Sequence, residues 1–309
     1  MGSTSTAQFP THPPEIQEVY ARMLRTAGMR GRFLPRPSGE RVHVVDSGSG
    51  QPAVHLHGTN TSSLSHLMLA ERMTSTRSYL VDRPGCGLSD PTQFTPGRFR
   101  DHAVRFIDYV LDALELDTVT LVGASGGGIW ATWYALTRPD RVRGLVMLGS
   151  VPALPGMHVP PPLRLMATPI LGDVLARGVK PTRRTLLRMM ASMGERDTIV
   201  AHPDLLDSLI AGARDPVAVA ANLAELRALM SPFGWRTSMR ITGQDLRRLA
   251  VPTLMIWGDH DPVVPLAHAQ AAAALIPNAR LEVVPAGHVP QLGNPDLVAE
   301  LLEGFTHAR

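Results

Sequence analysis

The chain has 309 residues, of which 44% are hydrophobic and 18% charged, and this composition is typical of a globular protein with a large core. Its single cysteine, Cys86, excludes a disulfide framework and suits a reducing compartment. No apolar run approaches the roughly 18 residues of a transmembrane helix, and the first residues lack the pattern of a secretory signal. We therefore expect a cytoplasmic protein in which residues 1–14 form a mobile N-terminal tail.

The net charge is +3, and nearly all the cations are arginine because Lys180 is the only lysine. The arginines are scattered and no motif for reading bases or backbone is present, so we expect no nucleic-acid partner. The stretch PTRRTLLRMM combines arginines with apolar residues as interfacial helices do. A solvated basic face is the interpretation we favour, and membrane binding is not expected. The sequence leaves the oligomeric state open.

Short apolar runs alternate with helical patterns, which predicts an α/β fold with a doubly wound, mostly parallel sheet. The expected strands are Arg41–Asp46, Ala53–His57, Ser78–Asp82, Val119–Gly123, Arg143–Leu148, Pro252–Trp257 and Arg280–Val284. The expected helices are 62–73, 100–115, 127–138, 266–275 and 295–307.

The regular alternation stops between residues 151 and 245. This stretch begins with the proline-rich VPALPGMHVPPP and continues as helical pieces rich in Leu, Met and Arg. The strand pattern resumes only at VPTLMIWG. We therefore expect an α/β core formed by residues 15–150 and 246–309, with residues 151–245 inserted as a helical cap.

A glycine-rich turn follows one of the most apolar expected strands. In VTLVGASGGGIW, Gly123 and Gly127 flank Ser125 in the pattern G-x-S-x-G. This pattern is typical of a nucleophile elbow, in which a sharp strand-to-helix turn presents a serine hydroxyl above the sheet edge. A serine hydroxyl is a poor nucleophile until a neighbouring base accepts its proton.

Four motifs in chain order resemble those of the α/β-hydrolase fold superfamily, specifically its cap-bearing, esterase-like branch. They are HLHGTN, DRPGCGLSD, LVGASGGG, and the late pair WGDHDPVVP and AGHVPQLGNP. The resemblance covers the chain from about residue 40 to its end. It implies the triad order Ser, Asp, His, which this sequence supplies as Ser125, Asp261 and His288.

Other polar residues near these three could be mistaken for members of the triad. The family pattern G-x-x-D-x-x-x-P matches Asp261 rather than Asp259, which we interpret as a turn residue. His288 follows a strand and is expected at the carboxyl edge of the sheet, where it can act as general base. His57, by contrast, is expected to brace its own loop. Cys86 lacks a His–Asn arrangement and is expected to be inert.

The backbone N–H groups of Gly126 and Thr59 are expected to form the oxyanion hole. Asn60, Met189 and Trp235 are expected to contact the substrate, the last two from the cap. Two positions depart from the family. Relatives usually carry a larger residue at Gly126, so we expect a widened acyl pocket there. They usually carry an acidic residue at Gly293, and its loss is expected to alter how the histidine loop is braced.

These features predict a serine hydrolase that cleaves an ester, thioester or lactone with a moderately large apolar group. No cofactor or metal is expected. Dehalogenases and epoxide hydrolases of this fold use aspartate at the elbow, so Ser125 argues against both. Carbon–carbon bond hydrolases keep the serine but usually have tryptophan where this chain has Val289. Such a hydrolase and a non-catalytic binding protein remain the alternatives.

Overall fold

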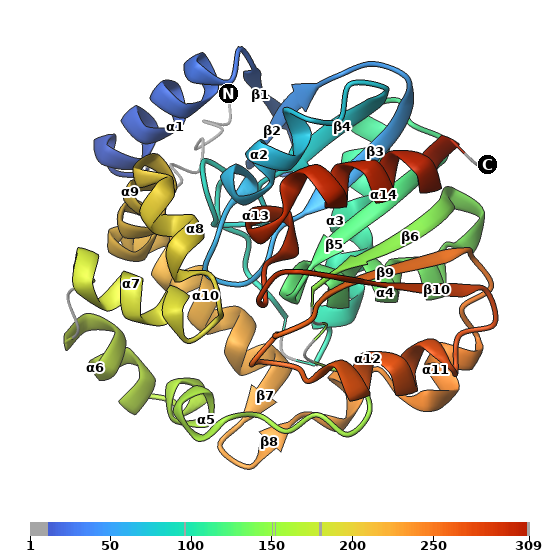
Figure 1. Ribbon diagram of the computed structural model, residues 1–309. Coiled ribbons are helices and arrows are strands. Elements are labelled where there is room, and N and C mark those ends of the chain that lie inside the picture. Colours follow the sequence, from blue (N-terminus) through green and yellow to red (C-terminus); the bar gives the residue numbers. More distant parts are fainter. Residues whose placement is uncertain (1–11, 96, 150, 152, 179–180, 308–309) are drawn as a thin grey trace, which may run out of the picture.

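The core of the protein is an eight-stranded sheet (Figure 1). The computed structural model describes residues 12–307 apart from 96, 150, 152, 179 and 180. The strand order is β1-β2-β4-β3-β5-β6-β9-β10; β2 is antiparallel to β1 and β4, and all other neighbours are parallel. The strands are β1 (Arg30–Pro35), β2 (Arg41–Ser47), β3 (Gln51–Leu56), β4 (Thr76–Val81), β5 (Val119–Ala124), β6 (Val142–Leu148), β9 (Thr253–Gly258) and β10 (Ala279–Val284). The predicted α/β fold with a mostly parallel sheet is confirmed.

Each strand expected from the sequence is present within two residues of its expected ends. The sequence did not indicate β1, because this edge strand reads RGRFLP and buries only Leu34. An exposed edge strand has neither the apolar run of a central parallel strand nor a clear alternation of apolar and polar residues, so no sequence pattern predicts it.

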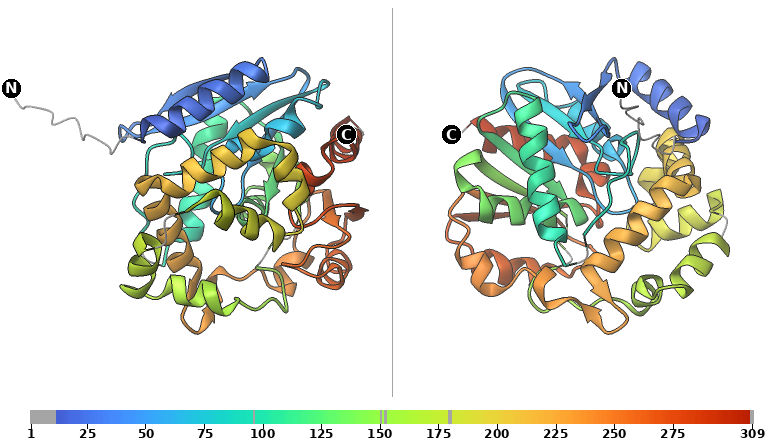
Figure 2. Two further views of the ribbon diagram at one scale, coloured as in Figure 1. Left: turned by 60° about the vertical axis from the view of Figure 1, so that its left-hand side comes forward. Right: turned by 180° about the vertical axis from the view of Figure 1, so that it is seen from behind.

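Helices cover both faces of the sheet because successive residues of the central strands point to opposite sides. Leu121 and Val122 of β5, for example, belong to separate hydrophobic clusters. On the face of Leu121 lie α3 (Phe99–Ala113), α4 (Gly126–Thr137), α11 (Gly243–Arg247) and α12 (Leu266–Ala273). On the face of Val122 lie α2 (Leu67–Ala70) and α14 (Pro295–His307). The view from behind in Figure 2 brings α3 to the front.

Of the seven α-helices between β6 and β9 among the described residues, six lie wholly within the interval expected for the cap, and we refer to these six as the cap helices. These cap helices are α5 (Pro161–Ala167), α6 (Leu171–Gly178), α7 (Arg183–Ala191), α8 (Arg196–Ala201), α9 (Pro203–Arg214) and α10 (Pro216–Leu229). A hairpin of β7 (Met230–Ser231) and β8 (Gly234–Trp235) follows them. Short elements complete the chain: η1 (Ser63–His66), η2 (Pro139–Arg141), η3 (Thr237–Met239) and α13 (Pro290–Gly293). Among the described residues, no helix combines the length and apolarity needed to cross a membrane.

The N-terminal segment is anchored sooner than the sequence indicated. Residues 1–11 of the expected tail lie outside the described residues, but α1 (Pro14–Thr26) packs against α9 and the sheet. The buried His12 bonds through Nδ1 to Asp215 Oδ2 at 2.5 Å and through Nε2 to Ser89 O at 2.9 Å. Residues 12–14 are therefore wrongly assigned to a mobile tail, because this histidine ties them to the cap and the core.

Both ring nitrogens of His12 face acceptors, which only the protonated imidazolium can satisfy in full. Burial alone would lower the pKa of His12, but the hydrogen bonds to Asp215 and Ser89 and the charge of Asp215 raise it overall. The contact therefore stabilises the fold fully below the ordinary histidine pKa and loses that contribution as pH rises through the raised value.

We expect His12→Gln to lower the free energy of unfolding by about 1.5–3 kcal/mol at pH 6, the scale of hydrogen bonds to charged groups. The difference from wild type should shrink as pH rises to 9. Urea unfolding of both proteins across this range measures it. A difference that is independent of pH would contradict a charged His12.

Candidate active site

Ser125 stands at the turn between β5 and α4 with a strained backbone, φ 47° and ψ −114°. The strain is possible because the neighbouring segments approach without side chains. A Cβ on Gly123 would lie 2.6 Å from the backbone of Gly127 and Gly128, and a Cβ on Gly127 would lie 2.1 Å from Leu56 O. The glycines therefore allow α4 to begin directly against β3 and β5, as a nucleophile elbow requires.

His288 lies within hydrogen-bond reach of Ser125, although 163 positions separate them in the chain. Its Nε2 is 3.2 Å from Ser125 Oγ, and its Nδ1 is 3.3 Å from Asp261 Oδ2. Both distances are at the long end of the range for hydrogen bonds. His288 and Asp261 are buried. The three side chains therefore form one chain of polar contacts that leads from an acid to a hydroxyl.

The two candidate acids have different surroundings. Asp261 accepts from the backbone N–H groups of Val263 at 2.8 Å and Val264 at 3.1 Å through Oδ1, which leaves Oδ2 directed at His288. Asp259 is exposed and accepts from Ala286 N at 3.2 Å, as a residue that holds a turn would do. The geometry favours Asp261 as the partner of the histidine.

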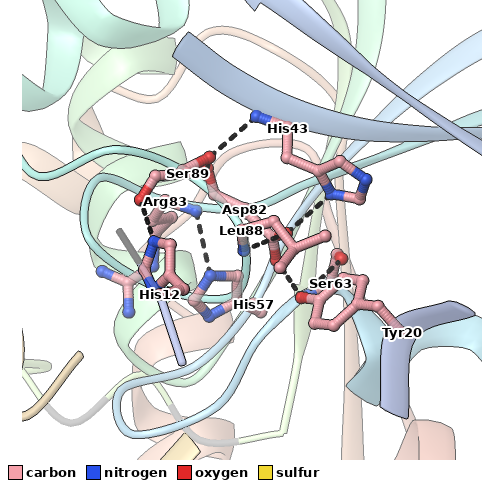
Figure 3. Close-up of polar contacts among 9 residues, drawn as sticks. All are labelled: His12, Tyr20, His43, His57, Ser63, Asp82, Arg83, Leu88 and Ser89. Carbon is pink, nitrogen blue, oxygen red and sulfur yellow. Dashed lines mark hydrogen bonds and ion pairs between the residues drawn. The ribbon is translucent and has the colours of Figure 1, made fainter. Parts of the chain in front are cut away.

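The loop HGTN is held by buried polar groups at the carboxyl ends of β3 and β4 (Figure 3). His57 bonds through Nδ1 to Gly58 O at 2.8 Å and accepts from Arg83 N at 3.0 Å through Nε2. Burial lowers the pKa of His57 to about 3, so the ring is neutral in both contacts. His57 therefore braces the loop, as expected, and has no free nitrogen for proton transfer.

Asp82 organises the same region from the end of β4 (Figure 3). It accepts from Tyr20 Oη at 2.7 Å, Ser63 N at 2.8 Å and Leu88 N at 3.1 Å, and contacts His43 Nδ1 at 2.8 Å. Burial alone would raise the pKa of Asp82, but the contact with His43 and the other bonds lower it overall. The carboxylate is thus fully engaged in joining α1, β2 and the loop after β3.

Gly126 and Thr59 meet next to Ser125. The first N–H groups of a helix have no acceptor within the helix, so Gly126 N at the start of α4 is available to a ligand. A Cβ on Gly126 would lie 3.2 Å from Thr59 N and only 2.3 Å from Thr59 Oγ1. The expectation of a widened acyl pocket at Gly126 is therefore wrong, because the Thr59 side chain fills that space.

Ser125 and His288 open into a cavity between the core and the cap helices. Asn60 and Met189 line it, as expected, together with Thr59. Further residues supply much of the remaining wall: Ile16, Met190, Met193, Ile199, Leu205, Ser208, Leu209, Asp215, Asn222 and Leu292. Periodicity alone does not separate them from cap residues that pack internally. None of the described residues that line the cavity is Arg or Lys.

Trp235 does not belong to this wall. It lies in the hairpin β7–β8 beyond the last cap helix and packs, partly buried, against the core cluster on the α4 face of the sheet. Its predicted role in substrate binding is therefore wrong. The sequence showed an aromatic residue in the cap, but not that a tight turn carries it away from the cavity.

A reactive thiol and a metal site would be two further kinds of functional site among the described residues. Burial raises the pKa of the Cys86 thiol to about 12, so it remains protonated and a poor nucleophile. No group of three or more His, Cys, Asp or Glu side chains in the described ranges is arranged to hold a metal ion.

A serine at a sharp strand-to-helix turn, a histidine and a carboxylate thus lie together at the carboxyl edge of a mostly parallel sheet. The profile of the alpha/beta hydrolase family matches residues 53–301, and the chain belongs to this family.

Among characterised relatives, the 2-hydroxymuconate semialdehyde hydrolase of Pseudomonas putida is 29% identical over 87% of this chain and 91% of its own length. The pimeloyl-[acyl-carrier protein] methyl ester esterase of Xanthomonas oryzae pv. oryzae is 32% identical, and the alignment covers 85% of this chain and 98% of the esterase. The structure of carboxylesterase CesB from Bacillus subtilis superposes with a TM-score of 0.75 at 24% identity, covering 95% of this chain and 98% of that one, and shares its fold.

The contact between Gly126 and Thr59 gives a paired test. We expect Gly126→Ala to reduce turnover of short and bulky esters alike, because its Cβ displaces Thr59. Adding Thr59→Ala removes the clashing Oγ1 and should restore at least part of the rate. The measurement is kcat/KM of both single variants and the double variant on acetyl and branched acyl esters. Selective loss on the branched esters alone would show that Gly126 faces an open acyl pocket after all.

Proposed function

We propose that the protein is a serine hydrolase for neutral carboxylic esters, thioesters or lactones that carry a moderately large apolar group. The observation that supports this most strongly is the contact chain from Asp261 through His288 to Ser125, at the wall of a largely apolar cavity. Each residue has a partner suited to one role, with Ser125 as nucleophile, His288 as general base and Asp261 as the orienting acid.

In the proposed reaction, Ser125 Oγ attacks the substrate carbonyl carbon while His288 Nε2 accepts the hydroxyl proton. Asp261 stabilises the resulting imidazolium through Nδ1. The carbonyl oxygen becomes an oxyanion, which in this proposal the neighbouring N–H groups of Gly126 and Thr59 stabilise. When the tetrahedral intermediate collapses, the bond to the leaving oxygen or sulfur breaks and His288 returns the proton to it. Water then repeats these steps on the acyl-enzyme and releases the acid.

The residues that line the cavity suit an uncharged, apolar ligand. Met189, Met190 and Met193 contribute flexible thioether side chains to its wall, and Ile199 and Leu209 add aliphatic surface. A buried carboxylate on a substrate would need a cationic partner, because an unpaired charge is costly to remove from water. Since no described wall residue is Arg or Lys, a neutral ester fits better than an anionic substrate.

A carbon–carbon bond hydrolase is the second candidate, because one relative is a 2-hydroxymuconate semialdehyde hydrolase. That name denotes an acidic substrate, which the described wall would not neutralise. A further relative, the methyl ester esterase, agrees with the ester hypothesis. A binding protein without turnover is the rival from another class, and the polar chain at Ser125 argues against it.

We expect wild-type protein to hydrolyse esters of increasing acyl length with a preference for apolar groups, and to leave the ring-cleavage product 2-hydroxymuconate semialdehyde essentially unreacted. Ser125→Ala should lower ester turnover by roughly 10³-fold or more, the scale of losing a triad member. Steady-state rates on such a panel, with circular dichroism of the variant as a folding control, measure both. Faster cleavage of 2-hydroxymuconate semialdehyde than of every ester would favour a carbon–carbon bond hydrolase. Equal activity of Ser125→Ala would refute the serine mechanism.

A further inference from the structure

The loop that carries His288 is bound by a cap segment, Met193–Glu195, between α7 and α8. Three successive backbone N–H groups of the loop donate to this segment. Gly287 N donates to Glu195 Oε1 at 2.9 Å, His288 N donates to Met193 O at 2.8 Å, and Val289 N donates to the same Glu195 Oε1 at 3.2 Å. One carboxylate oxygen therefore binds the peptide groups on both sides of the histidine.

Glycines allow the two segments to approach at backbone distance. A Cβ on Gly287 would lie 2.3 Å from Met193 O and 2.9 Å from Gly194 Cα. Gly194 itself has φ +78°, a conformation that other residues rarely adopt. The glycines thus allow the close approach of the two backbones, and the Glu195 side chain adds two of the three hydrogen bonds between them.

Glu195 also fills the space next to Gly293. A Cβ on Gly293 would lie 2.8 Å from Glu195 Oε2 and 3.1 Å from Oε1. Gly293 does not have a positive φ, so backbone conformation does not require a glycine there. The missing side chain at 293 and the carboxylate from the cap therefore complement each other in one small volume.

The Glu195 side chain is committed to this position. It is only 1% exposed, and its second oxygen accepts from Thr198 Oγ1 at 3.2 Å within the turn that starts α8. The backbone N–H of Glu195 donates to Met190 O at 2.8 Å, which holds the residue to the end of α7. Burial raises the pKa of Glu195, while the bonds from Val289, Thr198 and Gly287 oppose this shift.

We propose that Glu195 is a positioning residue for His288, so that the cap sets the backbone of the histidine loop. This inference rests on the proposed function, in which His288 moves the protons. Asp261 orients the ring through Nδ1, and Glu195 fixes the peptide groups from which the ring projects. Glu195 is not among the described residues of the cavity wall, whereas the neighbouring Met193 is. The same turn therefore joins the wall of the apolar cavity to the base.

The first test measures the loop itself and does not depend on activity. We expect Glu195→Ala to increase amide hydrogen exchange in a peptide spanning residues 285–290, because two N–H groups lose their acceptor. Glu195→Gln keeps a carbonyl oxygen at the same reach and should leave exchange near the wild-type rate. Asp197→Asn is the matched control, since Asp197 is a fully exposed acid on the same turn. Unchanged exchange in Glu195→Ala would overturn the proposal.

The second test measures catalysis by the same variants. A displacement of about 1 Å at a catalytic group can cost about 10²-fold in rate. We expect Glu195→Ala to lower kcat by roughly 10- to 100-fold with little change in KM, and Glu195→Gln to stay within about threefold of wild type. Equal losses in the two variants, or an unchanged kcat in Glu195→Ala, would contradict positioning through hydrogen-bond acceptance.

The third test moves the carboxylate to the histidine's own loop. In a Glu195→Ala background, Gly293→Asp places two oxygens close to the vacated positions, because its Cβ would have lain about 3 Å from both Glu195 oxygens. We expect Gly293→Asp alone to be damaging and the double variant to exceed both single variants in kcat, with hydrogen exchange restored. If the double variant is no better than Glu195→Ala in either measurement, the proposal is wrong.

These outcomes are separable from the proposed function. A wild-type protein that does not hydrolyse esters would refute the proposed function, while hydrogen exchange would still decide whether Glu195 holds the loop. If the wild-type protein is active and the Glu195 variants match it in kcat and in hydrogen exchange, the positioning role alone is refuted. Urea unfolding of each variant shows whether a lost rate reflects a lost fold.

Discussion

The close approach of β3, β5 and α4 is the constraint on which the rest of the site depends. It requires bare backbone at Gly123 and Gly127, and it holds Ser125 in a conformation that a non-glycine residue adopts only under pressure from its surroundings. The strained turn brings the hydroxyl to the sheet edge where the loop after β10 delivers His288. It also starts α4 at Gly126, next to Thr59 on the neighbouring loop. This close approach therefore places Ser125, His288 and the backbone N–H groups of Gly126 and Thr59 beside one another.

The cap is joined to this arrangement by buried polar contacts as well as by apolar packing. Asn222 of α10 accepts from Asn60 N at 3.0 Å, and Glu225 of the same helix pairs with Arg83 at 2.6 Å. His12 reaches Asp215 at the start of α10, and Glu195 holds the histidine loop. A buried charge or polar group that loses its partner is costly, so these contacts favour a single docked position of the cap. The helices that line the apolar cavity are consequently held to the segments that carry Ser125 and His288.

The sequence allowed much of the fold and the polar chain at Ser125 to be predicted, because apolar runs mark buried parallel strands and short motifs mark their ends. It could not reveal contacts between residues far apart in the chain. Thr59 fills the space beside Gly126, and Trp235 turns away from the cavity, although each position alone suggested the opposite. Gly293 did carry a signal, since the missing acid indicated that the histidine loop is braced differently from that of relatives. Only the structure shows that Glu195, from the cap, provides it.

In the proposed mechanism, Ser125 forms a covalent acyl intermediate. The direct measurement is rapid acid quenching of the protein during turnover of an apolar aryl ester, followed by intact-mass analysis and peptide mapping. We expect a mass increase of one acyl group on the peptide that contains Ser125, formed as fast as the first equivalent of phenol is released. Turnover without any adduct, or with the acyl group on another residue, would contradict it.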